Sequence, residues 1–222
     1  MKSINDILGE MRNAGKIQDV RMKGDKGEDA VLAICYDRKQ KIGNGLLYQS
    51  FKYPYQTSRS GVCYTGNIKY ENKEFIEFTD DSLNDEIDVL YVTPYRVLVI
   101  EVKSYNARTL DVYEHWFNRN GSPVDKSPVT QAEKHARHLY HAIYDVLPDG
   151  DPRYICPIVC FVDKCRIRDD RSDYFRNYIP VCVLNNLLST IQHCNTPLDY
   201  NLDLGAIKDK LNTIKLSIRK IL

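Results

Sequence analysis

The chain of 222 residues is long enough for one domain with a sizeable hydrophobic core. Its 31 Lys and Arg residues nearly balance its 30 Asp and Glu residues, which gives a formal net charge of +1. This balance excludes a uniformly basic surface, so any binding of DNA or RNA must rely on a local basic patch.

The cysteines and the N-terminus indicate the compartment. The chain has 7 cysteines, an odd number, and no CxxC pair, which favours a reduced, cytoplasmic setting. The first residues, MKSINDILGEMRNAG, are too polar for a signal peptide. No apolar run approaches the length of a membrane-spanning helix, so we expect no membrane partner.

A short helix is predicted at the N-terminus, where Ser3 can cap it and Gly15 can end it. Residues 1–23 are therefore interpreted as an N-terminal helical extension. A second helix is predicted after Gly27, because apolar residues recur at helical spacing at Ala30, Val31, Ile34 and Cys35. This helix has Glu28 in its first turn, where the helix dipole stabilises a carboxylate and explains the residue structurally.

Residues 40–85 form a Tyr-rich segment that we interpret as an insertion, with strands predicted at Gly45–Tyr53 and Lys69–Phe78. Aromatic and basic residues interleave there, a mixture that can stack bases and contact phosphates of a single strand. Tyr is also common in strands and at their wet edges, which explains the same pattern without a ligand. The acidic run from Asp80 to Asp85 is interpreted as a turn.

The stretch EIDVLYVTPYRVLVIEVKSY, residues 86–105, predicts a hairpin of two largely buried strands. The strands are expected at Asp88–Thr93 and Arg96–Lys103, with the turn centred on Pro94-Tyr95. The register matters, because a shift by one residue would move every side chain to the other face.

In this register Asp88 lies opposite Glu101, with Cβ atoms about 4.5–5.5 Å apart. Lys103 shares their face because it lies two residues beyond Glu101. Opposed carboxylates repel, and a divalent cation bound by both would remove the conflict; such hard oxygen ligands suit Mg²⁺ or Mn²⁺. The alternative is a solvated strand end whose charges protect a sheet edge.

A further helix is predicted from Gln131 to Asp145, with Thr130 as its cap. Gln131 can point its amide toward the sheet edge, where it could orient a water or a phosphate oxygen. Three histidines on this helix, His135, His138 and His141, suggest zinc. Their spacing spreads them around the helix and no further ligand completes a tetrahedral set, so we expect a solvated or phosphate-facing row.

The rest of the chain predicts a mixed sheet with helices on its faces, an α/β fold. Tyr154–Val162 (YICPIVCFV) is a continuous apolar run typical of a buried strand. Trp116 is interpreted as a packing anchor. The remaining predicted elements are a strand at Ile179–Leu184, a helix at Asn185–Cys194 and a C-terminal helix at residues 204–222.

The order Asp88, then Glu101-Val102-Lys103, resembles the D…(D/E)xK signature of the PD-(D/E)XK nuclease superfamily. More narrowly, EID followed by VIEVKSY resembles the nuclease-related domain called NERD. The resemblance extends from about residue 27 to residue 188 and includes Gly27-Glu28, Trp116 and the stretch PVTQAEKHARHL at Pro128–Leu139.

This resemblance implies one domain over residues 1–222, with a restriction-endonuclease-like mixed β-sheet core flanked by helices. It implies that Glu28 is a site carboxylate, that the Val102 carbonyl is a further metal ligand and that Gln131 is an orienting residue. The expected activity is Mg²⁺- or Mn²⁺-dependent hydrolysis of phosphodiester bonds, in DNA more than in RNA, with little base specificity. The oligomeric state stays open, and a homo-oligomer is compatible with the sequence.

Two other classes of function remain open at this point. The first is a non-catalytic nucleic-acid-binding or assembly module on the same fold. The second is a metal-dependent enzyme that acts on a phosphorylated small molecule. The presence of Asp88, Glu101, Lys103 and Glu28 favours the nuclease over a degenerate site.

Overall fold

The computed structural model describes residues 17–18, 26–37, 45–54, 57–58, 75–76, 84–104, 107–111, 113, 115–118, 120–124, 127–162 and 167–221. Its strands are β1 (Ile17–Gln18), β2 (Leu46–Pro54), β3 (Thr57–Ser58), β4 (Phe75–Ile76), β5 (Asn84–Val92), β6 (Val97–Lys103), β7 (Ala107–Leu110), β8 (Trp116–Asn118), β9 (Ile155–Phe161), β10 (Arg168–Asp169) and β11 (Val181–Val183). Its α-helices are α2 (Lys26–Asp37), α4 (Pro128–Ile143), α5 (Asp173–Tyr178), α6 (Leu187–Cys194) and α7 (Leu204–Ile221). Short 3₁₀ turns lie at Tyr144–Val146, Pro148–Gly150, Pro152–Tyr154 and Leu184–Asn186.

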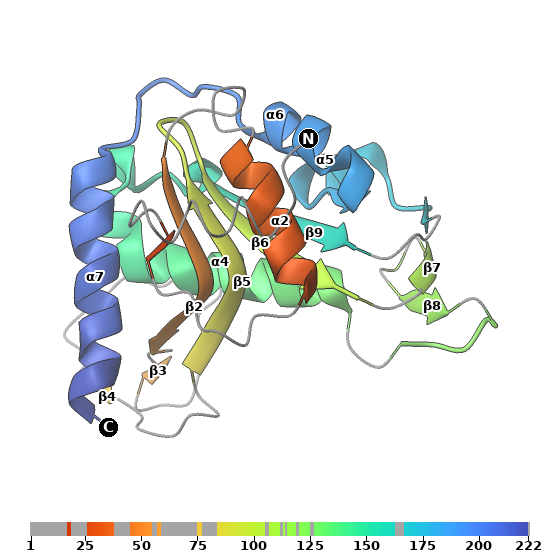
Figure 1. Ribbon diagram of the computed structural model, residues 1–222, viewed down its shortest axis with the longest axis horizontal. Coiled ribbons are helices and arrows are strands. Elements are labelled where there is room, and N and C mark those ends of the chain that lie inside the picture. Colours follow the sequence, from red (N-terminus) through yellow and green to blue (C-terminus); the bar gives the residue numbers. More distant parts are fainter. Residues whose placement is uncertain are drawn as a thin grey trace.

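The main sheet has 6 strands in the order β1-β2-β5-β6-β9-β11 (Figure 1). β5 is antiparallel to both β2 and β6, whereas β9 is parallel to both β6 and β11. β6 is central, and its first five residues are buried, as expected of a near-continuous apolar strand between two layers of helices. The architecture is the predicted mixed α/β fold with a restriction-endonuclease-like core.

The hairpin register is the predicted one. Val92 pairs with Val97 and Val89 pairs with Ile100, so the turn is centred on Pro94-Tyr95. This turn lacks the usual Asn-Gly pair, and a side chain stabilises it instead. The hydroxyl oxygen of Thr93 accepts hydrogen bonds from the N–H groups of Tyr95 and Arg96, at 3.1 and 3.0 Å.

Helices cover both faces of the sheet, with α2 in front and α4 behind in Figure 1. On the α2 face, Leu32 of α2 and Ile191 of α6 pack with Ile100 of β6 in one buried cluster. On the α4 face, Leu139 of α4 and Leu211 of α7 pack with Val99 of β6 in a second buried cluster. Each such side chain contributes about 1.5–3 kcal/mol when fully buried, so both layers hold the central strands in place.

Helix α4 begins earlier than predicted. It starts at Pro128 and is capped by Ser127, whose hydroxyl oxygen accepts from the Thr130 N–H at 3.3 Å. Proline favours the first helical position because its missing N–H would have no intrahelical partner there. The prediction of Thr130 as the cap is therefore wrong.

The other predicted elements can be compared where the chain is described. β9, β11, α6 and α7 lie where predicted to within a few residues, and Trp116 is buried against Phe161 with ring centroids 5.1 Å apart. The predicted helix at residues 3–15 lies outside the described residues, and only Phe75–Ile76 of the predicted strand at 69–78 is described. β2, which falls within the 40–85 segment, pairs with β5 in the main sheet. No helix in the described ranges is long and apolar enough to cross a membrane.

Candidate active site

Gly27 allows the start of α2 to lie directly on the ends of β6 and β9. A Cβ atom at this position would come within 2.9 Å of the Val162 side chain and 3.3 Å of the Val102 side chain. Glu28 follows in the first turn of the helix, as predicted, and the Ser50 hydroxyl donates to its carboxylate at 3.0 Å. The glycine thus allows the helix to bring a carboxylate to the edge of the sheet.

β5 changes its facing pattern at Asp88. Val89 packs on the α2 face, whereas Ile87 and Leu90 both pack on the α4 face, so the regular alternation breaks between them. Opposite this point in β2, Ser50 has a φ of 45°, in the left-handed region that non-glycine residues rarely adopt. Such strain persists only where the surrounding structure imposes it, and it occurs here beside the predicted site.

Asp88 occupies the point at which β5 and β6 separate. The last ladder pair on this side is Val89 with Ile100, and the next N–H of β6 that faces β5, from Val102, donates to Asp88 Oδ2 at 2.7 Å. A side-chain carboxylate therefore replaces a main-chain acceptor. This contact orients Asp88 beside Glu101, in agreement with the predicted register.

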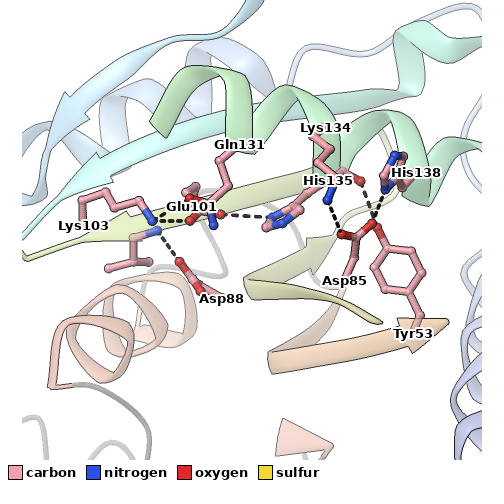
Figure 2. Close-up of polar contacts among 10 residues, drawn as sticks. Tyr53, Asp85, Asp88, Glu101, Lys103, Gln131, Lys134, His135 and His138 are labelled. Carbon is pink, nitrogen blue, oxygen red and sulfur yellow. Dashed lines mark hydrogen bonds and ion pairs between the residues drawn. The ribbon is translucent and has the colours of Figure 1, made fainter. Parts of the chain in front are cut away.

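Glu101 and Lys103 project from β6 toward α4 (Figure 2). Lys103 Nζ donates to Glu101 Oε1 at 2.5 Å and to Gln131 Oε1 at 3.1 Å. Glu101 is only 1% exposed, and its Oε2 lies 3.1 Å from His135 Nδ1 without completing a hydrogen bond. Helix α4 therefore contributes Gln131 and His135, about one turn apart, to the charged pair on the strand.

The electrostatics of this group leave negative charge in excess. Burial and the charges of Glu101 and Glu28 raise the pKa of Asp88 to about 8, although the Val102 N–H and the charge of Lys103 act in the opposite direction. Three carboxylates thus influence one another beside a single lysine. A divalent cation would offset this repulsion, and the hard oxygen donors, including the buried and unbonded Glu101 Oε2, fit Mg²⁺ or Mn²⁺. Within the described ranges, no group of three or more His, Cys, Asp or Glu side chains is arranged so that it could hold a metal ion.

All five side chains predicted for the site lie at this end of the hairpin: Glu28, Asp88, Glu101, Lys103 and Gln131. Their chemical roles stay predictions, as does the role of the Val102 carbonyl. His135 was not predicted to belong to this group. Its position four residues after Gln131 places both on one face of the helix, and this spacing could have identified it.

The prediction of a solvated or phosphate-facing histidine row is wrong for His135 and His138. Each is 6% exposed and faces the sheet. The reason is helical spacing, because both lie on the same side of α4 as the buried Leu139. His141 is half-buried and lies on a different flank of the helix, where it lines a pocket.

A second polar group, the Asp85 cluster (Tyr53, Asp85, Lys134 and His138), lies farther along α4 (Figure 2). Asp85 contacts His138 Nδ1 and accepts from Lys134 Nζ at 3.1 Å. Burial alone would raise the pKa of Asp85, but the hydrogen bond and charge of His138 and the charge of Lys134 outweigh it and lower the pKa below its ordinary value. Asp85 lies in β5 and is 5% exposed, so its interpretation as a turn residue is wrong.

The chain was compared with models of known protein families, with curated proteins and with solved structures. A family model described as the nuclease-related domain, NERD, matches residues 23–162, more than half of the 222 residues. The match contains Glu28, the whole hairpin and α4, and it ends nearer the N-terminus than the predicted limit at residue 188. Neither the curated proteins nor the solved structures give a significant match.

Proposed function

The chain belongs to the nuclease-related domain family, and from this premise we propose that it is a metal-dependent nuclease that hydrolyses phosphodiester bonds of DNA. The observation that carries the proposal is the convergence of Asp88, Glu101 and Lys103 at the point where β5 and β6 separate. A site of this kind contacts backbone phosphates, so we expect little base specificity.

The proposed metal ligands are Asp88 and Glu101, with Glu28 completing the shell directly or through water and the Val102 carbonyl as a further donor. The raised pKa of Asp88 and the surplus of carboxylates support this assignment. When bound, Mg²⁺ or Mn²⁺ would supply charge neutralisation at the phosphate and a more acidic water.

Lys103 is proposed to stabilise charge on the phosphate and to position the attacking water. Hydrolysis forms a bond from the water oxygen to phosphorus and breaks the bond from phosphorus to one sugar oxygen. An ammonium group has three N–H donors, and two of those of Lys103 are directed to Glu101 and Gln131. These contacts fix the amine, so its third N–H can donate to a phosphate oxygen as negative charge develops there.

Cleavage assays test the proposal directly. Supercoiled plasmid, labelled single-stranded DNA and labelled RNA are incubated with Mg²⁺, Mn²⁺ or EDTA. Lys103→Ala and Glu101→Ala proteins are compared with two matched controls outside the site, Lys134→Ala on α4 and Glu86→Ala on β5. We expect metal-dependent cleavage of DNA that both site variants lose and both controls retain.

Each other outcome has a distinct meaning. Cleavage that survives both site substitutions would overturn the assignment of these residues. Binding of DNA by the wild type and by Lys103→Ala without any cleavage would favour the non-catalytic nucleic-acid-binding module. Faster cleavage of RNA than of DNA would retain the chemistry and correct the substrate.

A further inference from the structure

A pocket of about 700 Å³ lies on a different flank of α4 from the candidate active site. Its walls come from the outer flank of α4, the start of β9, α5 and the end of α6, together with the residue Arg96 that precedes β6. Neither Glu101 nor Lys103 lines it. Its volume falls within the range of small-molecule sites, about 300–1,000 Å³.

Three buried nitrogen atoms of the pocket's lining residues lack a hydrogen-bond partner among the described residues: Arg96 Nε, Arg137 Nε and His141 Nε2. Buried donors are rarely left unpaired in folded proteins, because an unmade hydrogen bond there costs free energy. These side chains come from two separate parts of the chain, and all three residues line the pocket.

Arg96 is held in position by the protein itself. Its terminal nitrogens donate to the Arg153 carbonyl oxygen at 2.7 Å and to the Thr196 hydroxyl at 3.2 Å. Arg153 also lines the pocket, but its guanidinium is paired with Asp151 at 2.7 Å. Arg96 is therefore a fixed cation whose own partners are neutral.

The balance of charge in the pocket favours an anion. Among its described lining residues, Glu133 is the single carboxylate, against three arginines and two histidines. Burial, together with the charges of His138 and Arg137, lowers the pKa of His141, and burial lowers the pKa of Arg96, so a nearby anion would stabilise the charged form of both side chains. A phosphate group accepts several charge-assisted hydrogen bonds and would supply the missing partners.

The rest of the lining favours a flat organic group beside the anion. Ile155, Pro157 and Leu198 are apolar, and Tyr140 and Tyr178 contribute aromatic rings. The pocket is much larger than an inorganic ion. A nucleic-acid strand would need a continuous track of cations, whereas the arginines here line one pocket.

We propose that this pocket binds a small organic anion that combines a phosphate group with a planar ring, of the size of a nucleoside monophosphate. Arg96, Arg137 and His141 bind the phosphate, and the ring packs between the apolar wall and Tyr178. The site is independent of phosphodiester cleavage and of bound metal.

Calorimetric titration of the full chain in EDTA tests the proposal, because chelation removes any metal-mediated binding at the carboxylates. The probes are the 5′-monophosphates of adenosine, guanosine, cytidine and uridine, with adenosine and inorganic phosphate as partial ligands. We expect at least one monophosphate to bind with one-to-one stoichiometry, and both partial ligands to bind about tenfold or more weakly, because each lacks half of the contacts.

Variants assign the binding to the pocket. Arg137→Gln is expected to weaken the monophosphate about tenfold, because one charge-assisted hydrogen bond is lost. Arg168→Gln, an exposed arginine paired with Asp170, is the matched control and should leave affinity unchanged. Glu133→Gln should strengthen binding, because it removes the carboxylate that opposes the phosphate.

A second line of evidence does not depend on how Arg137→Gln folds. Tyr178 is half-exposed, so Tyr178→Ala should fold and should weaken the monophosphate without weakening inorganic phosphate. Absence of binding by every monophosphate at about 1 mM would overturn the proposal. Binding that survives Arg137→Gln but is lost in Lys103→Ala would place the ligand at the carboxylates and overturn it as well. If the protein binds a monophosphate in this pocket but cleaves no DNA, the proposed nuclease function fails and the pocket proposal stands.

Discussion

The candidate active site and the Asp85 cluster lie under the same helix and use the same residue types, yet their charges are balanced in opposite ways. In both, a buried carboxylate on a central strand meets a lysine and a histidine. In the Asp85 cluster the cations prevail and the pKa of Asp85 is lowered. In the candidate active site the carboxylates prevail and the pKa of Asp88 is raised to about 8.

This difference supports a structural role for the Asp85 cluster and the ligand-binding role that we propose for the candidate active site. Asp85 obtains its partners from α4, so the folded chain alone satisfies it. Asp88 accepts one hydrogen bond from a main-chain N–H and otherwise lies near other carboxylates. A bound cation would offset the repulsion between them. We expect substitutions in the Asp85 cluster to change stability and substitutions in the candidate active site to change activity and metal response.

The largest expected effect is on cleavage by Lys103→Ala. The rate on DNA should fall by about 10³-fold, equivalent to about 4 kcal/mol of transition-state stabilisation, because the ammonium group facing the phosphate is lost. Single-turnover assays on folded protein measure it. Lys134→Ala removes the lysine of the Asp85 cluster and should reduce the rate less than about twofold. An equal loss in both variants would remove the distinction between the two groups.

The next effect is on stability. His138→Leu should lower the free energy of unfolding by about 3 kcal/mol, because it leaves Asp85 buried without its closest partner. Urea denaturation measures this change. The double variant Asp85→Leu/His138→Leu should recover most of the loss, because it removes both polar partners together. A single variant as stable as the wild type would show that the contact is energetically neutral.

A smaller effect concerns metal. Mg²⁺ at ten times its dissociation constant should raise the free energy of unfolding of the wild type by about 1.4 kcal/mol. Asp88→Asn should lose this increment, since the carboxylate proposed to bind the cation is gone. Asp85→Asn should keep this increase, although its free energy of unfolding without metal should be lower than that of the wild type. Urea titrations with EDTA and with Mg²⁺ give both values, and an increment that persists in Asp88→Asn would exclude Asp88 as a ligand.

The smallest effect concerns acid. Because the pKa of Asp85 is lower in the folded chain than in the unfolded chain, protons bind preferentially to the unfolded chain in the window between the two values. Asp85 therefore stabilises the fold above its ordinary pKa of about 3.9, and this contribution is lost as the pH falls through the folded value. Asp85→Asn should show a shallower loss of stability between about pH 5 and pH 2. Identical acid profiles would contradict the lowered pKa.

Local patterns were sufficient to predict the hairpin and its charged pair. The apolar runs on both sides of Pro94-Tyr95 favour the register that the structure has, and its last pair, Val89 with Ile100, lies next to Asp88 and Glu101. Helical spacing placed Glu28 in the first turn after Gly27, and a family resemblance implied its role at the site. The close approach of α2 to Val102 and Val162, which requires the glycine, needed coordinates.

Partners that are distant in sequence could not be predicted in the same way. Asp85 resembles a turn residue among its acidic neighbours. Its buried position depends on His138 of α4, a helix that follows the hairpin in the sequence. His135 and His138 have the helical spacing of residues that face the sheet. Because they are polar, they were predicted to be solvated. The pocket beside α4 combines several elements, and no single stretch of sequence carries its pattern.

The Lys103 end of β6 also has a consequence for how the protein is synthesised. Beyond the last ladder pair with β5, this end of β6 pairs in parallel with β9, and the Val162 N–H donates to the Lys103 carbonyl oxygen at 3.0 Å. Parallel pairing across α4 is a long-range contact that forms slowly and requires both strands. A nascent chain that has emerged only as far as the hairpin carries Asp88, Glu101 and Lys103 but lacks both α4 and the parallel partner strand β9. Assembly of the carboxylates and the lysine therefore waits until β9 has been translated.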